Sequence, residues 1–309
     1  MSHRSAARVW GLAVSGRDSG KLEVTSPHRS EKTRHVWVRK APLPADAATE
    51  VDIRSLDGSE TYRFLVTTPE RTVADLMRTE SQECGHVALE SFLAHVHPGP
   101  GHSGDVDRPG RVPGFHGFNF QEWHARGATV PDHWVRPREI GAPLSWGLDV
   151  VPAELRELRK QCVDEILTGG TYGKVKSSAI ETLGQCAGLS GSPLEARTAY
   201  VLHRLGVTGW VQQQEFFDSE TGELDARVDI WFEKQRAVFE ADGKEKYGAD
   251  FDPRSGSFDS EKERQNRLAG HAGVVKRVTN EHLGGGSETT RPVGLMRMLR
   301  EARIVVPRW

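Results

Sequence analysis

The chain has 309 residues, 27% of them charged, and a formal net charge of −2 at pH 7. This length suffices for two domains with hydrophobic cores, and the small net charge excludes a uniformly basic nucleic-acid-binding surface, so any contact with DNA depends on a local patch. No apolar run approaches membrane-spanning length and the N-terminus has no apolar signal core, so we expect a cytoplasmic protein without membrane contacts.

The three cysteines, Cys84, Cys162 and Cys186, are far apart and form no CxxC pair. This pattern fits a reducing compartment and argues against a disulfide framework or a zinc site. We therefore expect neither kind of cross-link to organise the fold.

The first 40 residues predict a short helix and two strands. Ser2–Leu12 fits a helix that ends near Gly11, and Lys21–Thr25 and His35–Arg39 alternate as strands do. The region is basic, and two interpretations stay open: a surface that faces DNA, or a solvated helix and sheet edge. The basic residues are Arg4, Arg8, Arg17, Lys21, Arg29, Lys32, Arg34, Arg39 and Lys40.

A helix start follows at Thr68, which is a candidate N-cap with Pro69 at the first helical position. Arg71 and Asp75 are four residues apart on one helical face. An intrahelical ion pair is the first interpretation of that spacing, and contact with a ligand is the alternative. A further helix is predicted at Gln82–Val96.

The segments SHRSAARVWGL (residues 2–12) and VTTPERTVADL (residues 66–76) together resemble the AbiEi-type antitoxin family. The resemblance implies an antitoxin-like region over residues 1–96 and a cognate toxin protein as a partner. In that family a winged-helix DNA-binding domain normally precedes the first segment. Here the chain starts within that segment, so we expect the wing to be missing unless the true start codon lies upstream.

The segment His97–Trp146 carries seven prolines, many glycines and five histidines without a visible period. We interpret residues 97–150 as an irregular insert or linker, and its histidines match no metal-ligand spacing. Beyond it, helical spacing at Pro152–Leu167 and Lys174–Ala187 predicts a helical bridge over residues 151–189.

From residue 190 the pattern predicts a helix, a three-stranded meander, a second helix and a further strand. Ser192 and Pro193 open the first helix, which places Glu195 in a first turn where the helix dipole favours a carboxylate. The later elements are strands at Trp210–Phe217, Arg227–Phe232 and Ala237–Asp242, a helix at Ser260–Gly270, a strand at Val274–Val278 and a helix at Val293–Ala302.

Three carboxylates gather at the predicted hairpin. Strand alternation places Glu240 and Asp242 on one face of their strand, and Asp229 on the face of its own strand away from Val228, Ile230 and Phe232. If the strands pair, Asp229 and Glu240 come close together, and a divalent cation such as Mg²⁺ would relieve their repulsion. A solvated hairpin whose charges face water is the alternative.

The motifs SPLE (192–195), RVD (227–229), EADGK (240–244) and ERQNRL (263–268), together with Gln214, resemble a family of endonuclease-like domains. That family is uncharacterised and is related to the very-short-patch repair endonucleases, within the PD-(D/E)XK nuclease superfamily. The resemblance implies a PD-(D/E)XK-like core over residues 190–309. It also implies a metal-dependent DNA endonuclease that acts in DNA repair or phage defence.

The resemblance implies that Asp229 and Glu240 hold Mg²⁺ or Mn²⁺ and that Glu195 completes the site. The third catalytic position departs from the general motif, because Asp242 stands where lysine is usual and Lys244 is the nearest lysine. We predict Asp242 as an additional ligand or a water-positioning group. Lys244 is predicted to stabilise developing negative charge.

Lys262, Arg264 and Arg267 lie on the helix that follows the predicted site, and we predict that they contact DNA phosphates. A solvated helix face is the alternative. The sequence thus predicts an α/β protein with a smaller N-terminal α/β region and a nuclease-like C-terminal domain. A second function stays open: a non-catalytic antitoxin or transcriptional regulator of a toxin-antitoxin or abortive-infection system that retains a nuclease fold.

Overall fold

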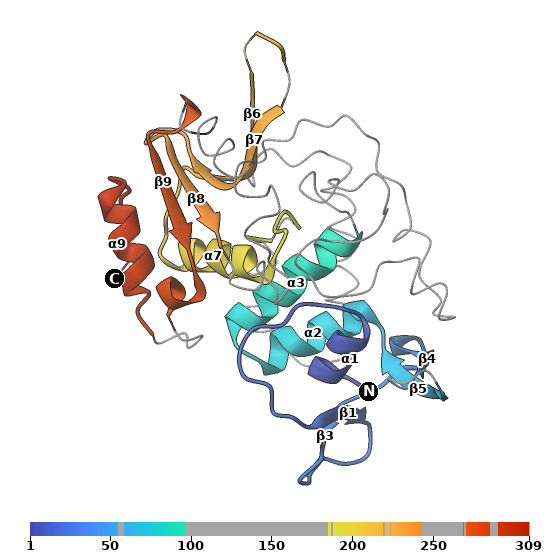
Figure 1. Cartoon of the computed structure of the whole chain (residues 1–309). Coiled ribbons are helices and arrows are strands. Elements are labelled where there is room, and N and C mark those ends of the chain that lie inside the picture. Colours follow the sequence, from blue (N-terminus) through green and yellow to red (C-terminus); the bar gives the residue numbers. More distant parts are fainter. Residues whose placement is uncertain are drawn as a thin grey trace. The chain divides into compact units, whose positions relative to one another are not determined.

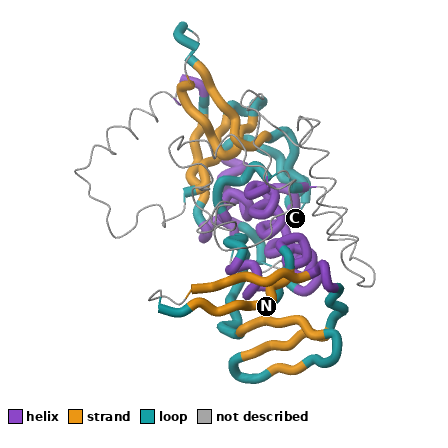
Figure 2. Tube along the Cα trace, turned by 90° about the vertical axis from the view of Figure 1, so that its right-hand side faces the viewer, coloured by secondary structure: helices purple, strands orange, loops and turns teal. Residues whose placement is uncertain are grey.

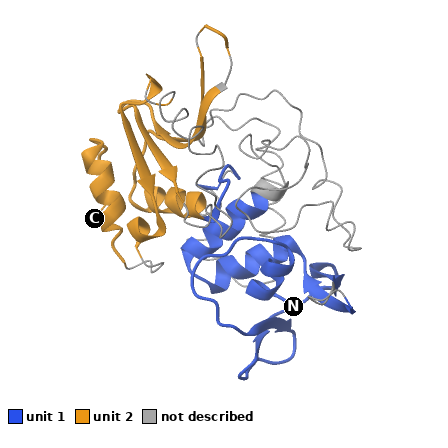
Figure 3. Cartoon of the chain, in the orientation of Figure 1, with its two compact units in different colours: residues 1–140, 152–193 blue, residues 141–151, 194–309 orange. Residues whose placement is uncertain are grey.

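The structure is a computed structural model, and it describes residues 1–54, 59–96, 185–186, 188–218, 220–222, 224–242, 268, 270–284 and 290–308. Helices and strands are mixed throughout this part of the chain, which confirms the predicted α/β class. The described residues form two compact units (Figure 3). Unit 1 ends at Pro193, and unit 2 continues from Leu194. The predicted insert over 97–150 and nearly all of the predicted bridge over 151–189 lie outside the described residues.

The described part of unit 1 has two small sheets and the helices α1, α2 and α3 (Figure 1). The first sheet has the order β1-β3-β2, with β1 parallel to β3, and the second is the antiparallel pair β4-β5. The elements are α1 (His3–Val9), β1 (Leu22–Ser26), β2 (Glu31–Lys32), β3 (Val36–Lys40), the 3-10 turn η1 (Ala45–Ala47), β4 (Ala48–Arg54), β5 (Thr61–Thr67), α2 (Pro69–Thr79) and α3 (Gln82–Val96).

The helix start predicted at Thr68 is confirmed. The Thr68 side chain accepts a hydrogen bond from the Arg71 backbone N–H, and α2 begins at Pro69. Apolar residues of α1, α2 and α3 share one buried core with residues of β4 and β5. The helices approach closely at Gly85, where an added Cβ would lie 3.2 Å from the Met77 Cα, so a larger residue would require Met77 to shift slightly.

Unit 2 is built on a four-stranded sheet of order β6-β7-β8-β9, drawn in orange in Figure 2. The first two strand pairs are antiparallel, and β8 pairs with β9 in parallel. The strand predicted at Val274–Val278 is confirmed. The elements are α7 (Pro193–Arg204), β6 (Val211–Phe217), β7 (Leu224–Phe232), β8 (Ala237–Ala241), β9 (Val274–Val278), the 3-10 turn η6 (Asn280–Leu283) and α9 (Val293–Glu301).

Apolar side chains of α7 and α9 pack with Ile230, Phe232 and Phe239 to form the main core of unit 2. Val228 belongs to a second cluster, together with Trp231 and Val238. Val228 therefore packs in a different cluster from Ile230 and Phe232, while buried and half-buried residues still alternate from Ala226 to Ile230.

The hairpin of β6 and β7 continues past β8 as an arm, because β7 pairs with β8 only from Ile230 to Phe232 (Figure 1). The His271 ring stacks on Phe216 of the arm at 4.8 Å between ring centroids, and its Nε2 lies 2.8 Å from the Asp225 Oδ2. These contacts connect the start of β7 to the residues that precede β9. Most of the helix predicted at Ser260–Gly270 lies outside the described residues, although Leu268 and Gly270 are helical.

Candidate functional site

The predicted carboxylates lie where β7 separates from β8. The last paired residues are Ile230 and Phe239, so the next step in the same register brings Asp229 opposite Glu240. At this point the Asp229 Oδ2 accepts a hydrogen bond from the Ala241 backbone N–H at 2.7 Å. The Asp229 carboxylate therefore lies against the short stretch of chain that joins Glu240 to Asp242.

The same place is distorted on the other side of β7. Gln212 pairs with Ile230 and Gln214 pairs with Val228, but Gln213, which would face Asp229, drops out of the ladder. Its φ of 55° is left-handed, a conformation that costs a non-glycine residue about 1–2 kcal/mol. Backbone strain of this kind persists only where surrounding contacts enforce it, and it concentrates at functional sites.

The strained backbone directs the Gln213 side chain to Glu195. The Gln213 Nε2 donates to the Glu195 Oε2 at 3.0 Å, and both residues are buried. Glu195 lies in the first turn of α7, as predicted. Glu195 and Gln213 thus come from α7 and β6 and are joined by a hydrogen bond, and Gln213 lies in the β6 position that would face Asp229 of β7. The sequence analysis missed Gln213, because a left-handed glutamine leaves no signal in a sequence.

Asp242 has a different partner. Its Oδ2 accepts from the Arg277 Nη1 at 3.0 Å, and its backbone N–H donates to the Val278 carbonyl at 2.8 Å. Arg277 lies on β9 and is the register partner of Glu240. The Arg277 guanidinium offsets the negative charge of Asp242 and connects the end of β8 to β9. Asp229 and Glu240 are therefore better candidates for metal ligands than Asp242. The sequence analysis also missed Arg277, which is remote in sequence from the hairpin.

The remaining residues predicted for this site are Lys244, Lys262, Arg264 and Arg267, and all four lie outside the described residues.

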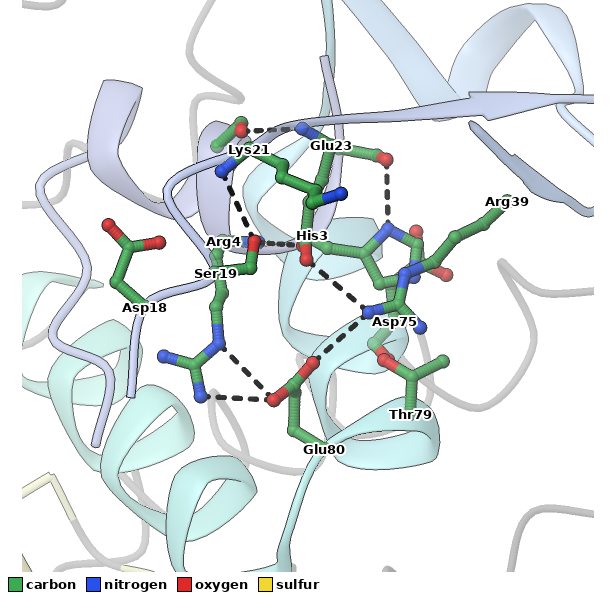
Figure 4. A network of polar contacts seen from close by, with 12 residues as sticks. His3, Arg4, Asp18, Ser19, Lys21, Glu23, Arg39, Asp75, Thr79 and Glu80 are labelled. Carbon is green, nitrogen blue, oxygen red and sulfur yellow. Dashed lines mark hydrogen bonds and ion pairs between the residues drawn. The ribbon is translucent and has the colours of Figure 1, made fainter. Parts of the chain in front are cut away.

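Unit 1 contains a second group of charged side chains, the Arg4–Glu80 network (Figure 4). The Arg4 guanidinium contacts the Glu80 carboxylate at 3.0 Å, and Arg39 contacts both Glu80 at 3.2 Å and Glu23 at 3.4 Å. The Arg4 backbone N–H also donates to Glu23 at 3.0 Å. Arg4 and Arg39 therefore belong neither to an exposed DNA-facing patch nor to a solvated edge, because they turn inward to acidic partners.

The Arg71–Asp75 pair is a structural ion pair, as the first interpretation of its spacing predicted. The Arg71 Nε lies 3.0 Å from the Asp75 Oδ1, and the side chains are 2% and 3% exposed. Arg71 also donates to the Pro42 carbonyl at 2.8 Å. Desolvation raises the pKa of Asp75 and outweighs the nearby arginines, which lower it.

In comparisons with known proteins, no family model matches the sequence, and neither a curated protein nor a solved structure matches it. Within the part of the chain that the structure describes, no helix is both long and apolar enough to cross a membrane. The functional argument therefore depends on the geometry of the two units.

Proposed function

We propose that unit 2 is a metal-dependent DNA endonuclease that hydrolyses phosphodiester bonds and acts in DNA repair or phage defence. The observation that carries the proposal is the Asp229 carboxylate bound to the Ala241 N–H, between Glu240 and Asp242. Two acidic residues on adjacent strands, at the point where the strands part, supply the hard oxygen ligands that Mg²⁺ and Mn²⁺ prefer.

The order of elements supports a PD-(D/E)XK-like core. Helix α7 precedes the meander β6-β7-β8, and β9 then adds in parallel beside β8. Parallel neighbours require a crossover connection, and in this chain the connection runs from Asp242 to Val274. The described helix α7, the meander and β9 agree with the positions that the resemblance implies, and most of the second helix lies outside the described residues.

Each acidic residue has a role that follows from its contacts. Asp229 and Glu240 would hold the metal, and a metal held there supplies a bound water of lowered pKa and offsets charge on a phosphoryl oxygen. The Ala241 N–H fixes the Asp229 carboxylate, and a carboxylate keeps further lone pairs for a cation after accepting one hydrogen bond. Glu195, which accepts a hydrogen bond from Gln213, would complete the site, and Asp242 contacts Arg277 of β9 at the end of β8.

The experiment is a cleavage assay on supercoiled and mismatched duplex DNA with Mg²⁺ or Mn²⁺. The informative variant is Asp229→Asn, because asparagine can still accept the Ala241 N–H while it loses the negative charge. Removing a direct metal ligand should reduce cleavage by more than about 10²-fold, which exceeds the effect of losing an outer-shell partner. We expect the same of Glu240→Gln.

Glu233→Gln is the matched control, because Glu233 is an exposed carboxylate in the turn at the other end of the β7–β8 hairpin. This variant should cleave as the wild type does. Circular dichroism would verify that each variant is folded, and calorimetric titration with Mn²⁺ would measure metal binding directly. Full activity in Asp229→Asn would contradict the proposal.

The second candidate function is a non-catalytic antitoxin or regulator whose partners are a cognate toxin protein and DNA. The Asp242–Arg277 ion pair favours it, because an arginine neutralises the position where the general motif has its catalytic lysine. Folded wild-type protein that binds no Mn²⁺ and cleaves no substrate would support this candidate over the endonuclease.

A further inference from the structure

Unit 1 contains a group of three side chains that could ligate a metal, and this group includes none of the acidic residues discussed for unit 2. His86 and Glu90 are four residues apart on α3 and so share one helical face. Cys186 follows 100 residues after His86, and its Sγ lies 3.3 Å from the His86 Nδ1. One ligand atom from each of the three residues lies within 4.8 Å of the other two, and all three residues are buried.

The Glu90 carboxylate holds the segment that carries Cys186. Its Oε1 accepts from the Gly188 N–H at 3.0 Å, and its Oε2 accepts from the N–H groups of Leu189 and Ser190, both at 3.2 Å. Backbone amides of this kind stabilise an ionised carboxylate without cancelling its charge.

We propose that His86, Glu90 and Cys186 bind a zinc ion. Thiolate, imidazole and carboxylate are the ligand types of protein zinc sites, and these residues supply three of the four positions of a tetrahedron. Zn–S and Zn–N bonds of about 2.3 and 2.0 Å at a tetrahedral angle separate sulfur from nitrogen by about 3.5 Å. The distance of 3.3 Å between Sγ and Nδ1 is close to that value.

Zinc binding would depend on pH and would affect the stability of the fold. The Cys186 thiol would release its proton on binding zinc, so the affinity falls in acid. The bound ion would connect α3 to the segment that leads into α7, and it would stabilise the folded state by mass action.

The zinc site differs from the proposed nuclease centre in its ligands. The three residues belong to unit 1 and include a thiolate, whereas Asp229 and Glu240 belong to unit 2 and offer only oxygen. Absorption spectra with cobalt(II) distinguish the two proposed sites, since only a thiolate ligand gives a sulfur-to-cobalt charge-transfer absorption. Asp229→Asn should therefore retain this absorption even though it loses cleavage.

The test uses the full reduced chain without a histidine tag, stripped with a chelator and titrated with zinc and with cobalt. We expect one equivalent of zinc to bind, the charge-transfer absorption to appear with cobalt, and thermal stability to rise with zinc. Cys186→Ser and His86→Gln should each weaken zinc binding by more than about 10²-fold. Cys84→Ser is the control, because Cys84 is an equally buried thiol of unit 1 that lies outside the group.

A folded wild-type chain that takes up no zinc, or a cobalt form without charge-transfer absorption, would overturn the proposal and leave a thiol–imidazole hydrogen bond. Equal zinc affinity in Cys186→Ser would overturn it as well. If that variant fails to fold, the rate at which a thiol reagent modifies the wild type decides the question. Zinc should slow the modification of Cys186, and an unchanged rate would count against the site.

Discussion

Two sets of carboxylates, one in unit 1 and one in unit 2, contact different kinds of partner. In unit 1, Glu80 contacts the guanidinium groups of Arg4 and Arg39, and Asp75 contacts Arg71. In unit 2, Asp229 accepts from a backbone N–H and Glu195 accepts from the Gln213 amide. An arginine offsets the charge of a carboxylate, whereas a backbone or amide N–H orients it without adding a charge. Glu80 and Asp75 of unit 1 are therefore structural, and we propose that Asp229 of unit 2, like Glu90 of unit 1, binds a metal.

Arg71→Met is the strongest test of the conclusion that the arginine-paired carboxylates of unit 1 stabilise the fold. Removing one partner of a buried pair leaves a buried carboxylate at Asp75, which should destabilise the fold by about 3–5 kcal/mol. The double variant Arg71→Met with Asp75→Leu replaces both charges with apolar groups and should recover most of that loss. Chemical unfolding followed by circular dichroism measures both. A double variant as unstable as the single one would show that the Arg71 contact with the Pro42 carbonyl dominates.

Variants of Gln213 test the unit 2 side of the comparison, because Gln213 is the neutral donor to the buried Glu195 carboxylate. Gln213→Ala should lose about 1.5–3 kcal/mol of stability, which is the usual range for a hydrogen bond to a charged group. Gln213→Gly loses the same amide but accepts the left-handed φ, so it should be more stable than the alanine variant by about 0.5–1 kcal/mol. Chemical unfolding of the two variants gives the difference. An alanine variant at least as stable as the glycine variant would mean that the strand relaxes to an ordinary conformation.

A pH dependence of stability is also expected, and it belongs to unit 1. Desolvation, and then the charges of Arg39 and Arg71, lower the pKa of His3 from 6.5 to about 3. The unfolded chain therefore takes up a proton below pH 6.5 that the folded chain does not take up until about pH 3. Stability is fully present above pH 6.5 and falls as the pH falls, by up to about 1.4 kcal/mol per pH unit.

His3→Asn is the variant that isolates this contribution. The His3 Nδ1 lies 2.8 Å from the Ser2 Oγ, and an asparagine amide can replace that contact without titrating. Asparagine also tolerates the φ of 50° at this position. Unfolding free energies between pH 7.5 and pH 5 should fall less steeply for the variant than for the wild type. Parallel curves would place His3 in contact with solvent.

Local patterns in the sequence determined most of the elements of both units. The Thr68-Pro69 start of α2, the span of α3, the meander and β9 follow from capping residues, periodicity and turn signals, all of which act over a few residues. The same short-range spacing predicted the Arg71–Asp75 pair and the position of Glu195 in the first turn of α7. The short turn between two predicted strands also indicated that Asp229 and Glu240 lie on adjacent strands.

Only the tertiary structure decided the partners. The left-handed Gln213, the Arg277 contact with Asp242 and the inward turn of Arg4 and Arg39 depend on residues that are distant in sequence. The lack of a CxxC pair argued against a zinc site, whereas the tertiary structure brings His86 and Glu90 together with Cys186, which lies 100 residues after His86. Local periodicity fixes which face of an element a side chain occupies. Packing between elements decides which groups that side chain contacts. For these charged residues, the contacts determine whether the side chain stabilises the fold or is suited to binding a metal.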